Sequence, residues 1–408
     1  MDKPVEVVLT TLSYGGDAIG HYNGMAVFVP FGLPGEVVKV NLLEKRKNYY
    51  RAEIVEVIKA ATDRIVPRCK HFGYCGGCHY QHLPYASQLK IKSEILRDQL
   101  TRIGKISDPP VLPVIPSPSE WNYRNHVQFH LDPGGILGFV AARDPQELIP
   151  IQECFLPEPA LSQLWPTLEF EPDSPIERVS LRAGSADDLM LILESEDEEM
   201  PEMELKSGVS VVHLNGDDSV ILAGDGFVVI NVLGRAFRVS AASFFQVNTQ
   251  MAEKMVEHLL QILPVSPATT LLDIYSGAGL FSAFFASRVG RLIGIESAPS
   301  SCEDFVQNLD EFENVELYEG FAGEILPALR VSAEVAIVDP PRAGLGKDVL
   351  DALLKIRPKK LAYVSCDPST LARDIARLTA GGYQLVQVTP FDLFPQTYHI
   401  ESISLLVC

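Results

Sequence analysis

The chain has 408 residues, of which 47% are hydrophobic and 21% are charged, and its net charge at pH 7 is −19. This length and composition predict a globular protein of about two or three domains, not a disordered, fibrous or disulfide-stapled chain. No apolar run approaches the length of a membrane span, and Met1–Glu6 lacks the basic and apolar parts of a signal peptide, so we expect a cytoplasmic protein. We also expect a monomer.

The negative charge is unevenly distributed along the sequence. Residues 1–130 contain 16 Lys and Arg against 12 Asp and Glu, a net charge of +4, whereas the remainder contains 18 against 41, a net charge of −23. A neutral-to-basic N-terminal part is compatible with a local phosphate-binding face, but the acidic remainder opposes nucleic-acid binding. Charge alone therefore favours neither RNA nor a small molecule as the ligand.

Residues 1–62 are predicted to form a small five-stranded barrel of the OB type. Segments rich in β-branched residues alternate there with Gly and Pro turns, and the segments with strand character are 5–9, 24–30, 36–43 and 50–58. Such barrels bind single-stranded nucleic acid on a basic and aromatic face. One cluster has this composition: Lys45, Arg46, Lys47, Tyr49, Tyr50 and Arg51. An ordinary solvated loop is the alternative interpretation.

A cysteine-rich segment follows the barrel. Cys69, Cys75 and Cys78 are separated by five and two residues, and Cys154 is the nearest candidate for a fourth ligand. In a reducing compartment this spacing indicates metal ligation and not disulfides. Four thiolates can hold a [4Fe-4S] cluster or a zinc ion, and neighbouring histidines keep zinc as an alternative. Structural cysteines without a metal are the third possibility.

The segment 63–240 is predicted to be a middle domain that carries these cysteines. Residues 84–103 have the apolar periodicity of an amphipathic helix, which we expect to pack on the C-terminal domain. The strand patterns return over 120–240 and predict a mostly antiparallel sheet. The acidic stretch 194–204 is expected to be a solvated loop.

From residue 241 to residue 408, strands alternate with helices, which predicts a doubly wound α/β domain. A strand runs into a turn that contains Tyr275 and Gly277, and the next strand ends in Glu296, where an acid can accept hydrogen bonds from a ribose. A third strand ends at Asp339. The turn lacks the further small residues of a pyrophosphate-binding loop, so it favours S-adenosylmethionine over a dinucleotide.

Cys366 follows a short apolar strand and precedes a predicted helix start. Amide dipoles at a helix start favour a thiolate, so this residue is a candidate nucleophile; a buried structural cysteine is the alternative. Arg342 follows Asp-Pro-Pro, where enzymes that methylate exocyclic base amines have an aromatic ring. A thiol with a late acid, Glu401, instead suits methylation of a pyrimidine carbon. Carbon 5 of uracil becomes nucleophilic when a thiolate adds at carbon 6, and a base must then remove its proton.

The motifs of the chain are Cys69-x5-Cys75-Gly-Gly-Cys78, Tyr123-Arg-Asn125, Gln152-Glu-Cys154, Phe244-Phe-Gln246-Val-Asn248, Asp273-x-Tyr275-Ser-Gly277-x-Gly279-x-Phe281, Asp339-Pro-Pro-Arg342, Ser365-Cys366-Asp-Pro368 and His399-x-Glu401. Together they resemble the S-adenosylmethionine-dependent RNA uracil-5-methyltransferases, in the branch with an N-terminal TRAM barrel and a four-cysteine iron-sulfur domain. The resemblance covers nearly the whole chain. It implies a Rossmann-like C-terminal methyltransferase domain and RNA as the partner, with 23S ribosomal RNA preferred and transfer RNA as the alternative.

The resemblance also implies a role for each matching residue. Cys366 would be the nucleophile and Glu401 the base. The expected cofactor contacts are Gln246, Tyr275, Gly277, Glu296 and Asp339. The expected ligands of a [4Fe-4S] cluster are Cys69, Cys75, Cys78 and Cys154. Phe244 is a candidate to line the space of a flipped uridine. The plainer readings are helix caps for Glu296 and Gln246 and an exposed strand residue for Glu401.

Two features depart from the pattern of the family. The segment 319–323 offers no Asp or Asn to meet the adenine of the cofactor. The chain is also unusually acidic for an RNA enzyme, so RNA binding is expected to depend on the N-terminal residues and to be salt-sensitive. A non-catalytic, metal-containing RNA-binding protein with the same fold is the competing hypothesis.

Overall fold

A computed structural model describes residues 3–186, 188–196, 208–216 and 218–408, so most of the predicted acidic loop 194–204 lies outside the described residues. The chain divides into two compact units. The first comprises Met1–Asp98, Phe139–Ile149 and Phe394–His399, and the second comprises Gln99–Gly138, Pro150–Leu393 and Ile400–Cys408. No helix in the described part of the chain is long and apolar enough to cross a membrane.

The first unit begins with a closed five-stranded barrel, as predicted. Its strand order is β1-β2-β3-β5-β4. The strands are β1 (Val5–Leu12), β2 (Ala18–Tyr22), β3 (Met25–Val29), β4 (Val37–Lys45) and β5 (Tyr49–Lys59). Only β2 gave no recognisable strand pattern in the sequence. Its Gly20 lies against β1, where an added Cβ would come within 2.3 Å of the Val7 side chain. A glycine therefore stands here because the two strands approach closely, and not because glycine favours strands.

A helix of the first unit anchors a short segment near the C-terminus. This helix, α1 (Tyr85–Arg102), confirms the helix predicted over 84–103. The Gln88 side chain donates to Gln396 Oε1 at 2.9 Å, and Lys92 Nζ donates to the Phe394 carbonyl at 3.0 Å. The segment 394–399 is therefore fixed to α1 just before the chain enters its last strand.

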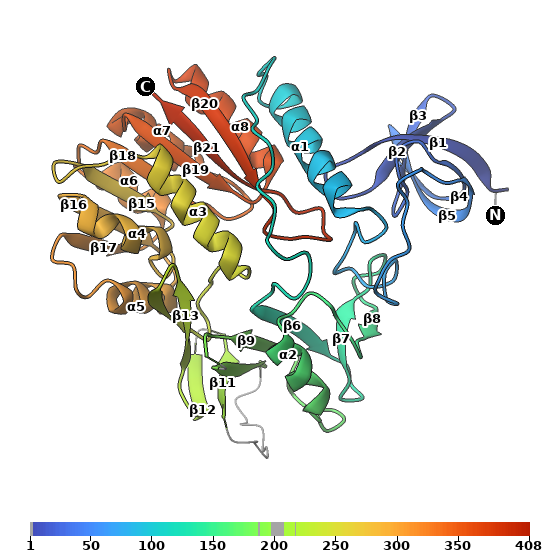
Figure 1. The fold of residues 1–408 in the computed structure, drawn as a ribbon, viewed down its shortest axis with the longest axis horizontal. Coiled ribbons are helices and arrows are strands. Elements are labelled where there is room, and N and C mark those ends of the chain that lie inside the picture. The colour runs from blue at the N-terminus through green and yellow to red at the C-terminus, as the bar shows by residue number, and fades with distance from the viewer. Residues whose placement is uncertain (1–2, 187, 197–207, 217) are drawn as a thin grey trace. The chain divides into compact units, whose positions relative to one another are not determined.

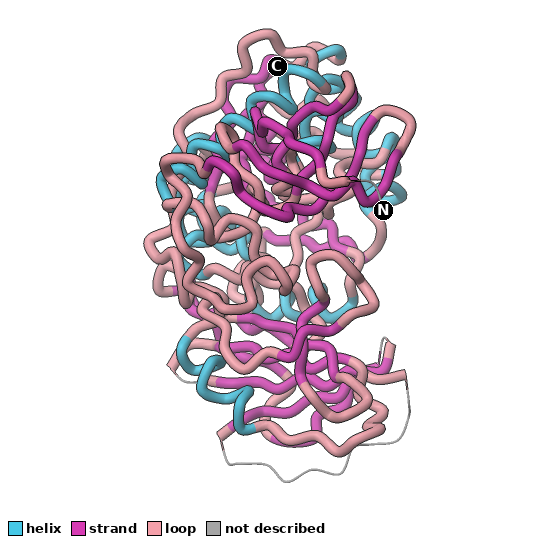
Figure 2. Tube along the Cα trace, turned by 90° about the vertical axis from the view of Figure 1, so that its right-hand side faces the viewer, coloured by secondary structure: helices cyan, strands magenta, loops and turns pink. Residues whose placement is uncertain are grey.

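The second unit contains a mostly antiparallel sheet, as predicted. Strands β12, β11, β10, β9 and β6 follow one another in this order, and only β10 and β11 pair in parallel. The bounds are β6 (His126–Leu131), β9 (Arg178–Ala183), β10 (Leu189–Glu194), β11 (Val209–Asn215) and β12 (Asp218–Ala223). The helix α2 (Pro159–Leu164), extended by the 3-10 turn η1 (Trp165–Thr167), lies beside β9 (Figures 1 and 2). Strand β7 (Leu137–Val140) leads into the first unit, and β8 (Leu148–Pro150) leads back.

The rest of the second unit is a seven-stranded sheet with the order β17-β16-β15-β18-β19-β21-β20. The first five strands are parallel, and β21 runs antiparallel to both β19 and β20. The strands are β15 (Thr270–Ile274), β16 (Arg291–Glu296), β17 (Val315–Glu319), β18 (Val335–Val338), β19 (Lys360–Ser365), β20 (Gln384–Phe391) and β21 (Glu401–Val407). A separate hairpin, β13 (Phe227–Val232) with β14 (Arg235–Ser240), precedes this sheet.

Helices flank this sheet, as Figure 1 shows. They are α3 (Thr249–Ile262), α4 (Leu280–Phe285), the 3-10 turn η2 (Ala286–Arg288), α5 (Pro299–Asn308), α6 (Ala322–Ala328), α7 (Lys347–Ile356) and α8 (Pro368–Ala380). Successive residues of β15, β18 and β19 are buried, so both faces of the central strands are covered. This burial explains why these strands read as continuous apolar runs, and it confirms the predicted α/β fold. The polar residues that end these strands gather at the carboxyl edge of the sheet.

Candidate active site

Cys366 and Glu401 meet across an antiparallel strand pair. Cys366 directly follows β19, and Glu401 is the first residue of β21. The two strands pair with Ser365 opposite Ser402, and one further step of this register places Cys366 opposite Glu401. Residues directly opposite in such a pair have Cβ atoms about 4.5–5.5 Å apart. The Glu401 side chain is 8% exposed, so it is not the exposed strand residue of the plainer reading.

The thiol of Cys366 is held in its neutral form. Burial raises the pKa of the Cys366 thiol to about 12, and the carboxylates of Glu401 and Asp339 act in the same direction, while Arg342 opposes them. Burial and these carboxylates therefore oppose the helix start, which was expected to favour a thiolate. Asp367 caps α8 with its own carboxylate, which accepts from the Ser369 and Thr370 amides at 2.9 Å, and adds negative charge.

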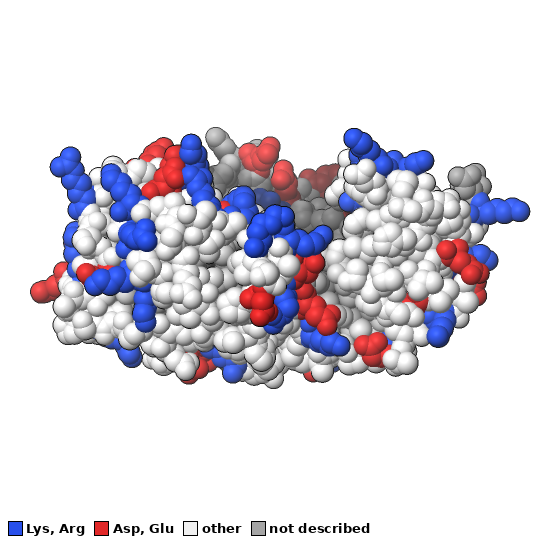
Figure 3. Space-filling view, turned by 90° about the horizontal axis from the view of Figure 1, so that it is seen from above, with Lys and Arg blue, Asp and Glu red and all other residues white. Residues whose placement is uncertain are grey.

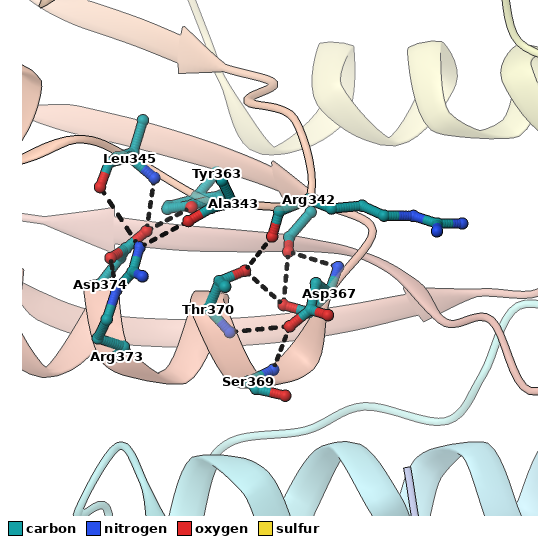
Figure 4. Close-up of polar contacts among 10 residues, drawn as sticks. Arg342, Ala343, Leu345, Tyr363, Asp367, Ser369, Thr370, Arg373 and Asp374 are labelled. Atoms are coloured by element: carbon teal, nitrogen blue, oxygen red, sulfur yellow. Dashed lines mark hydrogen bonds and ion pairs between the residues drawn. The ribbon is translucent and has the colours of Figure 1, made fainter. Parts of the chain in front are cut away.

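The loop that follows β18 is fastened to α8 (Figure 4). The Thr370 hydroxyl donates to the Arg342 carbonyl at 3.1 Å, and Arg373 donates to the Ala343 carbonyl at 2.9 Å. In Figure 4 the guanidinium of Arg342 extends away from this network. Arg342 is thus an exposed cation on a fixed backbone, close enough to the thiol to lower its pKa. Sequence reasoning treated this residue only as the replacement of an aromatic ring.

Asp374, in the same network, is fully buried and organises the loop. Its carboxylate accepts from Tyr363 Oη and from the Leu345 amide, each at 2.8 Å, and pairs with Arg373. We expect Asp374→Ala to lower the free energy of unfolding by about 2–4 kcal/mol, because the tyrosine hydroxyl and the amide lose their acceptor. Chemical denaturation measures the loss. Asp351→Ala, which removes an exposed aspartate paired with Arg377, is the matched control and should cost much less; equal losses would refute the organising role.

The glycine turn after β15 and the acid after β16 form one hydrogen-bonded group. Glu296 accepts from the amides of Gly277 at 2.9 Å, Ser297 at 2.7 Å and Ala298 at 2.8 Å. The carboxylate therefore fixes the glycine turn and the two residues that precede α5 (Pro299–Asn308), and the ribose contact stays a prediction. Gly279 adopts the left-handed conformation, with φ 85°, and an added Cβ would lie 2.4 Å from Leu309.

Two further carboxyl groups lie at this edge of the sheet. Burial raises the pKa of Asp273 to about 6, although the Ser282 hydroxyl donates to it at 2.6 Å. Burial, with Asp273 and Glu296 nearby, raises the pKa of Asp339 to about 7. Among the described residues, the buried Asp273 Oδ1 and Ser276 Oγ have no hydrogen-bond partner. An edge with buried polar atoms that need partners fits a polar ligand with several hydroxyl and amine groups.

Gln246 and Phe244 lie in the segment before α3. Phe244 is 66% exposed, which leaves its ring available to a ligand. Asn248, and not Gln246, caps α3 through its side chain, so the capping reading of Gln246 is wrong. Asn125 holds the segment in place by donating to the Gln246 carbonyl and to Thr249 Oγ1, each at 3.0 Å. The motif that contains Asn125 had been noticed in the sequence, but this supporting role was not.

Comparisons with known proteins identify the family. The family model for tRNA (Uracil-5-)-methyltransferase matches residues 208–407. An RNA methyltransferase of Halalkalibacterium halodurans is 32% identical, over 98% of this chain and 96% of that protein. One of Streptomyces avermitilis is 33% identical, over 100% and 98%. The chain belongs to the tRNA (uracil-5-)-methyltransferase family.

The fold agrees with this assignment over the full length of the chain. The crystal structure of Pyrococcus abyssi tRNA (uracil-54, C5)-methyltransferase, which was determined with S-adenosyl-L-homocysteine, has a TM-score of 0.76. Its sequence is 24% identical, and the comparison covers 99% of this chain and 100% of that protein. The N-terminal barrel is a TRAM domain, because the TRAM model matches residues 3–55. The chain is thus an RNA methyltransferase of the uracil-5 family with a TRAM domain.

The four cysteines of the predicted cluster are not gathered into a metal site among the described residues. No group of three or more His, Cys, Asp or Glu side chains is placed there to hold a metal ion. Cys69, Cys75 and Cys78 belong to the first unit and Cys154 to the second. Burial raises the pKa of the Cys75 thiol, with Cys69 acting in the same direction, and the Gly77 amide donates to Cys75 Sγ at 3.3 Å. The iron-sulfur cluster therefore stays a prediction.

The basic and aromatic cluster of the TRAM domain lies at the junction of β4 and β5. Lys45 pairs with Tyr50 in the strand register and lies 5.8 Å from its ring centroid, while Arg46 forms an ion pair with Glu44. The cluster is thus mostly a strand hairpin and not a free loop. In Figure 3, Lys and Arg side chains stand out from the surface beside scattered Asp and Glu side chains, although the whole chain is acidic. A basic and aromatic strand hairpin is compatible with binding of a phosphate backbone.

Proposed function

We propose that the chain is an S-adenosylmethionine-dependent RNA methyltransferase that forms 5-methyluridine. The observation that carries the proposal is the strand register that places Cys366 opposite Glu401, beside Asp339 and Arg342. A thiol and a buried carboxylate that lie together are the nucleophile and the base that methylation of a pyrimidine carbon requires. The Arg342 cation also offers a partner to an RNA phosphate.

The proposed roles follow from the chemistry of uracil. The Cys366 thiol gives up its proton to water, and the thiolate sulfur forms a bond to carbon 6. The π bond between carbons 5 and 6 breaks, and its electron pair moves to carbon 5 and the carbon 4 carbonyl as an enolate. Arg342 favours the thiolate in this step, because its positive charge lowers the pKa of the thiol. After carbon 5 has gained the methyl group, Glu401 accepts the proton from carbon 5. The electron pair of that C–H bond restores the double bond, and the sulfur leaves carbon 6 as thiolate.

S-adenosylmethionine, when bound, supplies the methyl group. The residues proposed to hold it are Gln246, Tyr275, Gly277, Glu296 and Asp339. The unpartnered Asp273 Oδ1 and Ser276 Oγ support a polar ligand at this edge of the sheet. Phe321, the residue before α6, is 69% exposed next to β17 and offers an apolar surface where the family pattern predicted an adenine contact that the sequence lacks.

The proposed substrate is 23S ribosomal RNA, and the four-cysteine spacing of that branch of the family supports it. Transfer RNA is the second candidate, because the description of the family model and the Pyrococcus abyssi structure both name it. The test incubates the protein with methyl-labelled S-adenosylmethionine and either RNA, followed by nuclease digestion and mass mapping. We expect labelled 5-methyluridine from 23S ribosomal RNA. If only transfer RNA is labelled, transfer RNA is the substrate instead. Label in another nucleoside, or no label in either RNA, would refute the proposal.

We further propose that Cys69, Cys75, Cys78 and Cys154 bind a [4Fe-4S] cluster, with zinc as the alternative. The Gly77 amide donating to Cys75 Sγ supports this, since such hydrogen bonds are one of the features that tune clusters. Protein purified without oxygen is expected to be brown, with iron and sulfide in equal amounts. Cys75→Ser should lose the colour, whereas Cys302→Ser, in α5, should keep it. Zinc, or no metal, in colourless wild-type protein would contradict the cluster.

A further inference from the structure

The first unit contains a pocket that shares no residue with the candidate active site. Its volume is about 450 Å³, within the roughly 300–1,000 Å³ typical of ligand pockets. Three segments line it: the TRAM barrel, the cysteine-rich loop and the stretch 141–149. The lining residues that matter below are Phe31, Ile54, Phe72, Tyr74, Arg143 and Glu147. The proposed chemistry of methyl transfer uses none of them.

Aromatic rings form much of the wall of this pocket. The Phe72 ring packs edge-on against Phe31, with 5.2 Å between centroids, and lies 5.1 Å from the ring of His82. Tyr74 is different, because its side chain is 71% exposed. The pocket therefore combines rings held by neighbouring rings with one ring whose face is open to a ligand.

The backbone that carries these rings is fixed before any ligand binds. Phe31 has a φ of 62°, a left-handed conformation that is costly for a bulky residue. Arg64 holds it by donating to the Phe31 carbonyl at 2.8 Å while pairing with the buried Glu36. The Tyr74 carbonyl accepts from the Ala142 amide at 2.7 Å, which joins two of the lining segments. Strain retained at an aromatic residue of a preformed pocket is typical of a binding site.

The polar side chains of the pocket supply a donor and an acceptor. Arg143 is paired with Glu53 at 2.8 Å but is half-exposed, so its remaining donors can reach a ligand. Glu147 is exposed and accepts hydrogen bonds when ionised. Each RNA base has both donors and acceptors on its edge, and stacking on aromatic rings tolerates any base. A lipid or an apolar peptide would use neither charged group.

We propose that this pocket binds one unpaired nucleobase of the RNA, stacked on Tyr74 and held at its edge by Arg143 and Glu147. The inference rests on the proposed function in taking RNA as the partner. Phe31 and Ile54 belong to the TRAM domain, so the base is held partly by the module expected to bind RNA. The pocket would thus read a nucleotide other than the methylated uridine and help to position the RNA.

The test is RNA binding, measured separately from methyl transfer. Fluorescence anisotropy follows a short labelled single-stranded RNA of mixed sequence with the wild-type protein, Tyr74→Ala and Tyr74→Phe. Because one base–aromatic stack is lost, we expect Tyr74→Ala to bind about 10-fold more weakly and Tyr74→Phe to bind like wild type. Two substitutions in β5 form a matched pair. Ile54→Ala changes a residue that lines the pocket and should weaken RNA binding, whereas Ile58→Ala changes an exposed residue outside the pocket and should not.

Photocrosslinking provides a second readout. RNA that carries 5-iodouridine is expected to crosslink to the peptide containing Phe72 and Tyr74, and the crosslink should disappear in Tyr74→Ala. If the wild-type protein binds RNA and Tyr74→Ala binds it with the same affinity, the pocket does not hold a nucleobase. That result would overturn this inference but not the proposed function. Absence of RNA binding by the wild-type protein would instead overturn the proposed function. Altered self-association of Tyr74→Ala with unchanged RNA affinity would assign the pocket to a protein partner and also overturn the inference.

Discussion

Cys366→Ala is expected to abolish methyl transfer to RNA, with a loss of at least about 10⁴-fold, because the sulfur of Cys366 is the atom proposed to add to carbon 6 of uracil. Binding of S-adenosylmethionine and of RNA should persist, since the thiol is not needed for either. Methyl transfer is measured with labelled S-adenosylmethionine, and both binding constants by calorimetry. Cys408→Ala is the matched control, because this exposed thiol lies at the C-terminus away from the site residues.

The covalent step can be observed directly. RNA that contains 5-fluorouridine should become attached to the wild-type protein and not to Cys366→Ala, because fluorine at carbon 5 cannot be removed as a proton. Attachment should become faster as the pH rises, since the reactive species is the thiolate and the pKa of the thiol is raised to about 12. An adduct with Cys366→Ala, or an attachment rate that falls with rising pH, would refute the thiolate mechanism.

Glu401→Gln is expected to stop the reaction after methyl transfer. The amide cannot accept the proton from carbon 5, so the sulfur cannot leave, and methylated RNA should remain bound to Cys366. We expect turnover to fall by about 10²–10⁴-fold, the usual contribution of a general base. A protein–RNA band that survives denaturing electrophoresis and carries the methyl label measures the trapped species.

Two further variants separate this role from a structural one. Cys366→Ala combined with Glu401→Gln should give no band, and Glu313→Gln, an exposed glutamate in the turn before β17, should turn over normally. If Glu401→Gln releases 5-methyluridine at the wild-type rate, another group must remove the proton from carbon 5. Loss of the fold in Glu401→Gln, detected by circular dichroism, would make the buried carboxylate structural and not catalytic.

Local patterns in the sequence were sufficient for most of the fold. The barrel, the helix α1 and the α/β sheet were predictable because their apolar residues follow the period of a strand or helix, or form runs buried on both faces. The strand β2 was not, because Gly20 is accommodated by close contact with the Val7 side chain of the paired strand β1, and a glycine carries no strand pattern of its own.

Local sequence patterns did not predict the pKa of the Cys366 thiol. The helix start after Cys366 suggested a thiolate, but the carboxylate of Asp367 occupies the amides, and two more carboxylates raise the pKa of the thiol further. The sequence contains those residues but does not show that they converge. The sequence also gave no sign that Arg342 lies near the thiol, or that Phe72 and Tyr74 line a pocket with Arg143.

The sequence by itself determined which residues can do chemistry: a thiol at a strand end, acids at three other strand ends or starts, and a glycine turn, all recognisable from their spacing and their neighbours. Only the tertiary structure decided that Cys366 and Glu401 face each other. That outcome depends on the pairing register of β19 with β21, where a shift of one residue would turn the carboxylate to the opposite face of the sheet. The burial that keeps the thiol protonated is likewise a property of the packed sheet and its covering helices.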